Sequence, residues 1–125
     1  MKATELMIGD WVCLKDDTKC EFPLKVDGVL TDDISLEGEG FLGGVDGLIR
    51  PIPITPEILE KNGWKRREVF MDMKADENIN FSWTDLYGES LFQNSYCMCD
   101  CKYVHTLQHA LRLCGLDELA DNFKI

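Results

Sequence analysis

A proline-rich segment near the middle of the chain constrains the possible folds more than any other feature. It begins at Pro51, and its first two prolines cannot donate the hydrogen bonds of a central strand, although an extended edge strand tolerates them. Thr55 is a typical N-cap residue, Pro56 occupies the first helical position, and Gly63 supplies a left-handed stop. The segment therefore predicts an extended edge followed by a short helix over residues 56–62.

The half of the chain before this helix, residues 1–54, is predicted to be rich in β-structure. Residues 5–14 form an opening unit in which a Gly9-Asp10 turn precedes an apolar run, and further strands are expected at 22–30 and 34–37. Short strands at this spacing predict a strongly bent antiparallel sheet or an SH3-like small barrel.

The second half, residues 55–125, alternates apolar and polar residues in a way that predicts a β-meander. A hairpin over 69–83 and a third strand at about 90–99 are expected, followed by a helix at about 102–114. A short final turn adds apolar residues up to Phe123. The predicted class is α+β: an N-terminal bent sheet or small barrel, a short helix, and a C-terminal antiparallel meander with a packing helix. We expect a single domain over 1–125 in which both halves share one core.

Composition places this domain among packed globular proteins and indicates its compartment. Apolar residues make up 45% and charged residues 29%, which favours a packed core over disorder. No run approaches the roughly 20 apolar residues that span a bilayer, and the N-terminus lacks the apolar core of a signal peptide. A cytoplasmic location is therefore expected, where all six cysteines would be reduced.

The net charge of −10 bears on possible partners. A negative surface repels nucleic acid and anionic lipid, so we expect no membrane partner and regard nucleic acid as a poor candidate. The negative surface favours a basic protein partner or simple solubility, and solubility is the simpler cause. The oligomeric state stays open, and no cofactor is predicted.

One glycine-rich segment, Gly38–Gly43, matches G-x-G-x-x-G literally. That pattern holds a dinucleotide only where it opens a helix, and Gly44, Gly47 and Pro51 follow here. A surface loop is therefore expected instead.

A cysteine run and a histidine pair are the weak candidates for a metal site. The run is Cys97, Cys99 and Cys101, whose alternation in a strand would place neighbouring sulfurs about 7 Å apart, too far for easy chelation of one ion. His105 and His109 have the i, i+4 spacing that lets two imidazoles share a zinc ion. The run could instead be small buried hydrophobes.

The same helix face allows two other interpretations. His105, His109 and Arg112 lie together by helical phase, which favours an ordinary solvated polar face. His105 and Gln108 flank the apolar stripe and could instead hydrogen-bond the neighbouring sheet.

A basic stretch surrounds Trp64. Lys61, Lys65, Arg66 and Arg67 could bind a phosphate or an acidic partner, or could be the charged end of the helix and the start of a strand.

These observations leave three hypotheses for function. No G-x-S-x-G or other nucleophile-with-base pattern is found, so the first is a non-enzymatic interaction or accessory protein. The second is a metal-binding or small hydrolytic enzyme that uses His105, His109 and the cysteine region. The third is an acidic inhibitor that imitates nucleic acid.

Three segments, taken together, resemble an uncharacterised family of short proteins from gut bacterial genomes and their phages or mobile elements. They are Met1–Val12, Pro51–Trp64 and Lys102–Gln108, and the likeness extends from end to end of the chain. The resemblance implies a phage or mobile-element context, and it implies no catalytic residues. The segment Ile8–Val12 also looks like the first strand of SH3-like barrels, a likeness of fold alone.

Overall fold

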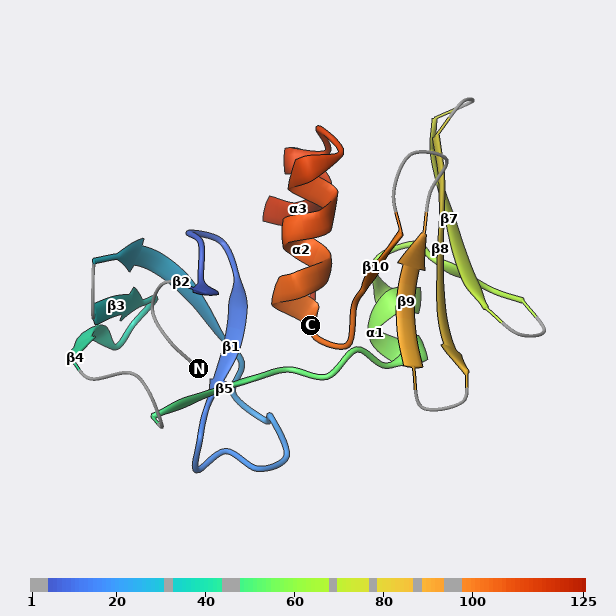
Figure 1. Ribbon diagram of the computed structural model, residues 1–125. Coiled ribbons are helices and arrows are strands. Elements are labelled where there is room, and N and C mark those ends of the chain that lie inside the picture. Colours follow the sequence, from blue (N-terminus) through green and yellow to red (C-terminus); the bar gives the residue numbers. More distant parts are fainter. Residues whose placement is uncertain are drawn as a thin grey trace.

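Two antiparallel sheets flank a pair of helices in the computed structural model, which confirms the predicted α+β class (Figure 1). Helices α2 (Val104–Leu113) and α3 (Asp117–Asp121) lie between the sheets. The structure describes residues 5–30, 33–43, 48–67, 70–76, 79–86, 89–93 and 98–125.

The N-terminal sheet has five strands in the order β4-β3-β2-β1-β5. Each neighbouring pair is antiparallel, and the pairings of the described residues do not join β4 to β5. The sheet is therefore open along the part of the chain that is described. Its strands are β1 (Trp11–Leu14), β2 (Leu24–Val29), β3 (Asp33–Leu36), β4 (Gly40–Gly43) and β5 (Ile49–Pro51).

The strand β4 corrects the prediction of a surface loop at Gly38–Gly43. Gly38 and Gly40 have φ of 82° and 75°, a left-handed conformation that glycine adopts without strain. They turn the chain after β3 so that Leu36 pairs with Gly40. The glycines therefore serve a β-hairpin.

The central proline-rich segment behaves as predicted. Strand β5 lies at the sheet edge, where Pro51 tolerates pairing with Val12. Helix α1 (Pro56–Lys61) begins at Thr55, whose side chain accepts a hydrogen bond from the Ile58 amide at 3.2 Å.

The C-terminal sheet also has five antiparallel strands, in the order β10-β9-β8-β7-β6. Phe81 and Trp83 are buried on one face of it, as the alternation predicts. The single strand expected at 90–99 is wrong, because β9 ends at Gln93 and the antiparallel β10 begins at Met98. The strands are β6 (Lys65–Arg66), β7 (Met71–Asp76), β8 (Ile79–Leu86), β9 (Glu89–Gln93) and β10 (Met98–Asp100).

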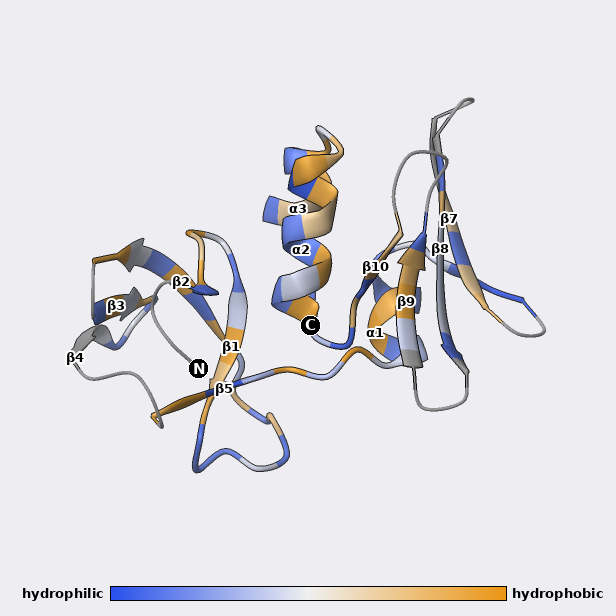
Figure 2. Ribbon diagram, in the orientation of Figure 1, coloured by the Kyte–Doolittle hydropathy of each residue, from blue (hydrophilic) through white to orange (hydrophobic). Residues whose placement is uncertain are grey.

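Helix α2 has the apolar stripe that the sequence predicts. Val104, Leu107 and Leu111 are buried, and the helix carries hydrophilic residues as well as this apolar stripe (Figure 2). Gly115 has φ of 78° and follows the helix end. In the part of the chain that the structure describes, no helix has the length and hydrophobicity to cross a membrane.

The predicted shared core is divided into two clusters. The smaller cluster lies under the N-terminal sheet and consists of Leu6, Val12, Val26, Ile34, Leu36 and Ile49. The larger one gathers around α2, the C-terminal sheet and Ile52, and β1 contributes Cys13 to it. Alternation explains the division, because Val12 and Cys13 are neighbours in one strand and face opposite sides.

A disulfide joins Cys13 of β1 to Cys20, so the expectation that all six cysteines are reduced is wrong. A turn in the loop between β1 and β2 brings the two Cα atoms to 5.9 Å, a separation usual for a disulfide. The expectation rested on compartment alone, whereas the pairing depends on this local turn.

Candidate functional site

A buried carboxylate joins the turn before β1 to helix α2. Asp10 is 0% exposed, and its Oδ2 accepts hydrogen bonds from the Met7 amide at 2.8 Å and from His109 Nε2 at 2.6 Å. Its Oδ1 accepts from Arg112 Nη1 at 2.7 Å. The prediction that this face of α2 is solvated is therefore wrong for His109 and Arg112, because both side chains bind this carboxylate.

Gln108 makes the second connection, which confirms that its side chain hydrogen-bonds the neighbouring sheet. It is 0% exposed, and its Oε1 accepts from the Trp11 amide at 3.0 Å. Its Nε2 donates to the carbonyls of Gly9 at 2.8 Å and Ala120 at 2.9 Å. One amide side chain thus joins β1, α2 and α3.

Position 9 requires a glycine because side chains of α2 and α3 lie very close to its backbone. Its φ is 95°, and a Cβ atom placed there would lie 2.9 Å from Arg112 Nη2 and 3.2 Å from Asp121 Oδ1. Any larger residue would displace the ion pair between Arg112 and Asp121.

His105 lies beside this cluster without sharing its hydrogen bonds. Its ring stacks on Tyr103 at 6.0 Å and meets His109 edge-on at 5.6 Å. Its Nδ1 is buried and has no hydrogen-bond partner among the described residues. Burial lowers the pKa of His105; the charge of His109 adds to this effect, and those of Asp10 and Glu5 oppose it.

This lowered pKa predicts a loss of stability in acid. The unfolded chain binds a proton at His105 near pH 6.5 while the folded chain resists it, so stability should fall as pH drops below that value. Replacing His105 with phenylalanine keeps a ring and removes the proton. Denaturant unfolding at pH 7.5 and pH 5 should show a smaller acid loss for His105→Phe than for the parent, and equal losses would contradict the prediction.

Those predicted metal candidates that the structure describes do not gather into one site. Cys97 lies outside the described residues, Cys99 is half-buried, and Cys101 is buried. Burial, with a smaller contribution from Cys99, raises the pKa of Cys101 far above its usual range, so its thiol stays protonated. Within the described chain, the three potential ligands that do converge are Cys13, Asp17 and Cys20. Sequence spacing missed this group because a turn assembles it.

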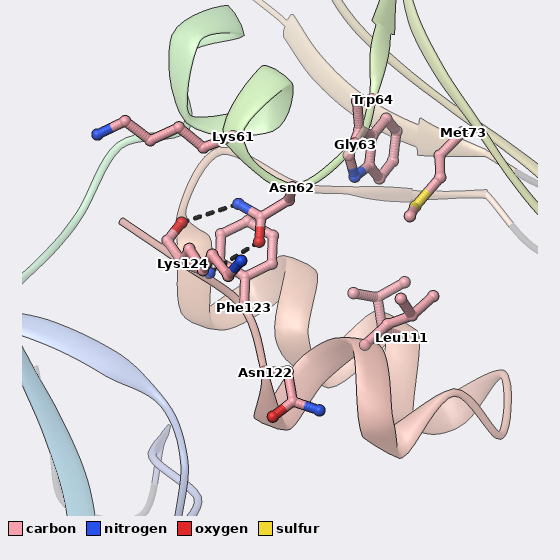
Figure 3. A pocket seen from close by; sticks show the side chains of 10 residues that line it. Lys61, Asn62, Gly63, Trp64, Met73, Leu111, Asn122, Phe123 and Lys124 are labelled. Carbon is pink, nitrogen blue, oxygen red and sulfur yellow. Dashed lines mark hydrogen bonds between the residues drawn. The ribbon is translucent and has the colours of Figure 1, made fainter.

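A cleft of about 360 Å³ with both apolar and polar lining residues opens between the end of α1, the C-terminal sheet and the two last helices (Figure 3). Trp64 and Met73 lie on the side of the sheet and Leu111 on the side of α2. Asn62 closes one end, because its side chain donates to the Lys124 carbonyl at 2.8 Å and accepts from the Lys124 amide at 2.7 Å. The remaining lining residues are Lys61, Gly63, Leu119, Asn122 and Phe123.

The basic residues around Trp64 differ in whether they form salt bridges. Arg66 binds Glu60 at 2.9 Å, and Arg67 binds Asp72 at 3.1 Å. Two lysines at the cleft, Lys61 and Lys124, form no salt bridge with the carboxylates described. Figure 3 shows the Lys61 side chain extending outward from the rim. Trp64 itself is buried at 4% exposure and forms part of the cleft wall.

Comparisons with known proteins leave the site to be judged by its own geometry. No protein-family model, curated protein or solved structure matches this chain. In the polar cluster around Asp10, both carboxylate oxygens already accept hydrogen bonds from groups of the protein itself. The cleft, by contrast, is lined by the partly exposed Met73 and Leu119 and by lysines that form no salt bridge with the carboxylates described, which makes it the better candidate for binding.

Proposed function

We propose that this chain is a non-enzymatic interaction protein whose cleft binds an acidic protein partner through an apolar side chain. The observation that carries the proposal is the cleft of about 360 Å³ with Lys61 and Lys124 among its lining residues. Its size is at the lower end of the range for ligand pockets, which suits one or two side chains of a partner.

Charge supports an acidic partner despite the net charge of −10. The Debye length in physiological salt is about 8 Å, so a segment at the cleft responds chiefly to the nearest charges. Lys61 and Lys124 are the charged residues that line the cleft, and neither forms a salt bridge with a carboxylate of the described chain. Distant carboxylates slow the approach of the partner without removing this local attraction.

The chemistry of the polar groups gives less support to a hydrolytic enzyme. His109 Nε2 is bound to Asp10, and the Cys101 thiol is held protonated by burial. The metal-binding or hydrolytic alternative and the nucleic-acid mimic stay predictions. Origin in a phage or mobile element belongs to the proposal as well, and it rests on the resemblance of three segments.

Reversing the charge of the cleft should abolish partner binding. We expect Lys61→Glu/Lys124→Glu to weaken binding at least about tenfold, because two attractive charges become repulsive beside a desolvated contact. Partners cross-linked to the parent protein would be identified by mass spectrometry and purified. Titration calorimetry would then give the Kd of each purified partner for the parent and the variant.

The matched control is Lys15→Glu/Lys19→Glu, which makes the same charge change on the loop between β1 and β2. Both lysines are exposed and neither lines the cleft. The Kd of the control for the partner should lie within about twofold of the parent's, since exposed charges that do not line the cleft are screened by salt. Equal weakening by both double variants would show general electrostatics and would remove the cleft from the proposal.

A further inference from the structure

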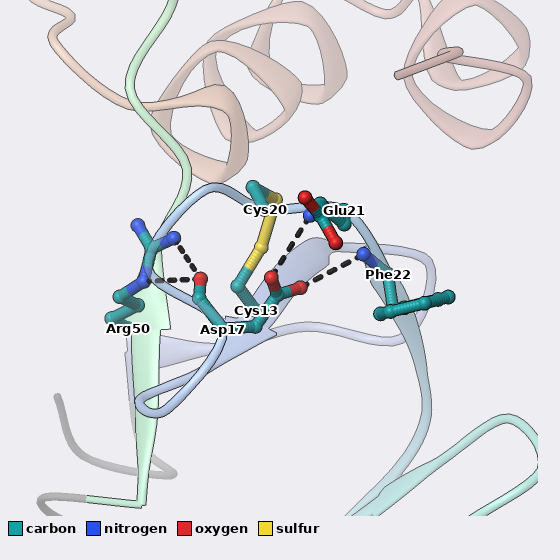
Figure 4. The surroundings of a disulfide bond; sticks show 6 residues. All are labelled: Cys13, Asp17, Cys20, Glu21, Phe22 and Arg50. Atoms are coloured by element: carbon teal, nitrogen blue, oxygen red, sulfur yellow. Dashed lines mark hydrogen bonds between the residues drawn. A yellow bond between two sulfur atoms is a disulfide. The ribbon is translucent and has the colours of Figure 1, made fainter.

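We infer that the loop between β1 and β2 is a redox-gated zinc site, in which reduced Cys13 and Cys20 bind the ion together with Asp17. The inference stands apart from the cleft and its partner. It begins from three potential metal ligands that lie close together, two of which are cysteines seven residues apart in the sequence (Figure 4).

The three ligand atoms are already close to one another. The two sulfurs and a carboxylate oxygen of Asp17 all lie within 4.8 Å of each other. In a tetrahedral site with zinc bonds of 2.0–2.3 Å, neighbouring ligand atoms lie roughly 3.5 Å apart. The carboxylate therefore needs only a small movement, while the sulfurs separate when their bond is reduced.

Asp17 is held in place on the sulfur side by the backbone of its own loop. Its Oδ1 accepts from the Glu21 amide at 2.9 Å and its Oδ2 from the Phe22 amide at 2.8 Å. Arg50 of β5 donates to the Asp17 carbonyl through Nε at 3.1 Å and also through Nη2. Each carboxylate oxygen keeps a further lone pair, so Asp17 can ligate a metal without giving up these bonds.

The burial of the site suits an ion that is held firmly. Cys13 is 0% exposed, and Asp17 and Cys20 are half-buried. Two thiolates and a carboxylate form a ligand set that zinc accepts, with water at the fourth position. Cys20 has φ of 51°, a left-handed backbone conformation, and its sulfur meets that of Cys13 in β1.

The two states are connected by a balanced exchange. A dithiol reductant transfers two electrons and two protons: the bond between Cys13 Sγ and Cys20 Sγ breaks, two thiols form, and the reductant becomes a disulfide. Zinc binding then releases the two thiol protons, because the thiolates are the ligands. Oxidation by a disulfide reverses the sequence: the two thiolates give two electrons to the oxidant, which takes up two protons and becomes a dithiol, the bond between the two sulfurs re-forms, and the ion leaves.

Cobalt binding to the reduced, untagged protein tests the inference. After reduction with a phosphine, the parent should bind one equivalent of Co²⁺ with the visible absorption of a tetrahedral thiolate site. Zinc should displace the cobalt, and the oxidised protein should bind none. Cys20→Ser should abolish the signal, and Asp17→Asn should weaken binding at least about tenfold.

A matched double variant separates this site from the other cysteines. Cys99→Ser/Cys114→Ser should retain the full cobalt signal, since both residues are described and neither belongs to the group. Because Cys20 and Asp17 are not fully buried, their variants should stay folded, which circular dichroism would check. A cobalt signal that persists in Cys20→Ser, or no signal in the reduced and folded parent, would overturn the inference.

Discussion

Replacing Asp10 with alanine is expected to lower the free energy of unfolding by about 3–5 kcal/mol, the cost of removing one partner from a buried ion pair. The carboxylate accepts three hydrogen bonds, from Met7, His109 and Arg112. Without it, the Arg112 side chain, which is only 12% exposed, keeps a desolvated charge beside an empty space. Urea unfolding of parent and variant, followed by circular dichroism, would measure the loss.

Asp121→Ala is the control for this substitution. Asp121 also pairs with Arg112, at 3.3 Å, but its side chain is 59% exposed. An exposed pair contributes at most about 1 kcal/mol, so this variant should unfold close to the parent. If Asp10→Ala were as stable as Asp121→Ala, the polar cluster would not be what holds the turn before β1 to α2.

Gln108→Leu is the second substitution for which we expect a large effect, at least about 2 kcal/mol in the free energy of unfolding. Leucine occupies a similar volume, so the loss comes from hydrogen bonds alone. The Trp11 amide and the Gly9 carbonyl would lose their partner, while the Ala120 carbonyl keeps the Phe123 amide at 3.3 Å, and each buried unsatisfied group costs about 1–3 kcal/mol.

Gln93→Leu makes the same chemical change at an exposed position of β9. It should alter the free energy of unfolding by no more than about 0.5 kcal/mol. Thermal denaturation of the two variants beside the parent would give the comparison. Similar melting temperatures for both leucine variants would mean that water reaches Gln108 and replaces its bonds.

Local chemistry made much of the fold predictable. Helix α1 follows from Thr55, Pro56 and Gly63, whose roles depend only on neighbours within a few residues. The buried stripe of α2 and the alternation of Phe81 and Trp83 follow from periodicity in the same way.

The candidate sites were less predictable because they depend on contacts across the chain. Gly9-Asp10 has the sequence of an ordinary turn, and nothing near it shows that the carboxylate is buried against α2. The cleft likewise combines Trp64 with Leu111 and Phe123, which belong to separate segments. The disulfide depends on which sulfurs the loop between β1 and β2 brings together, and the residues near Cys13 and Cys20 do not show this.

The connection of the N-terminal sheet to the last helices sets an order for folding. Asp10 binds His109, and Trp11 Nε1 donates to the Phe123 carbonyl at 2.7 Å, so these contacts join residues 99 and 112 positions apart. During synthesis the N-terminal strands emerge long before their partners exist. Contacts of such long sequence separation slow folding and leave surface exposed in the interval. The incomplete chain should therefore depend on chaperones until α2 and α3 have been made.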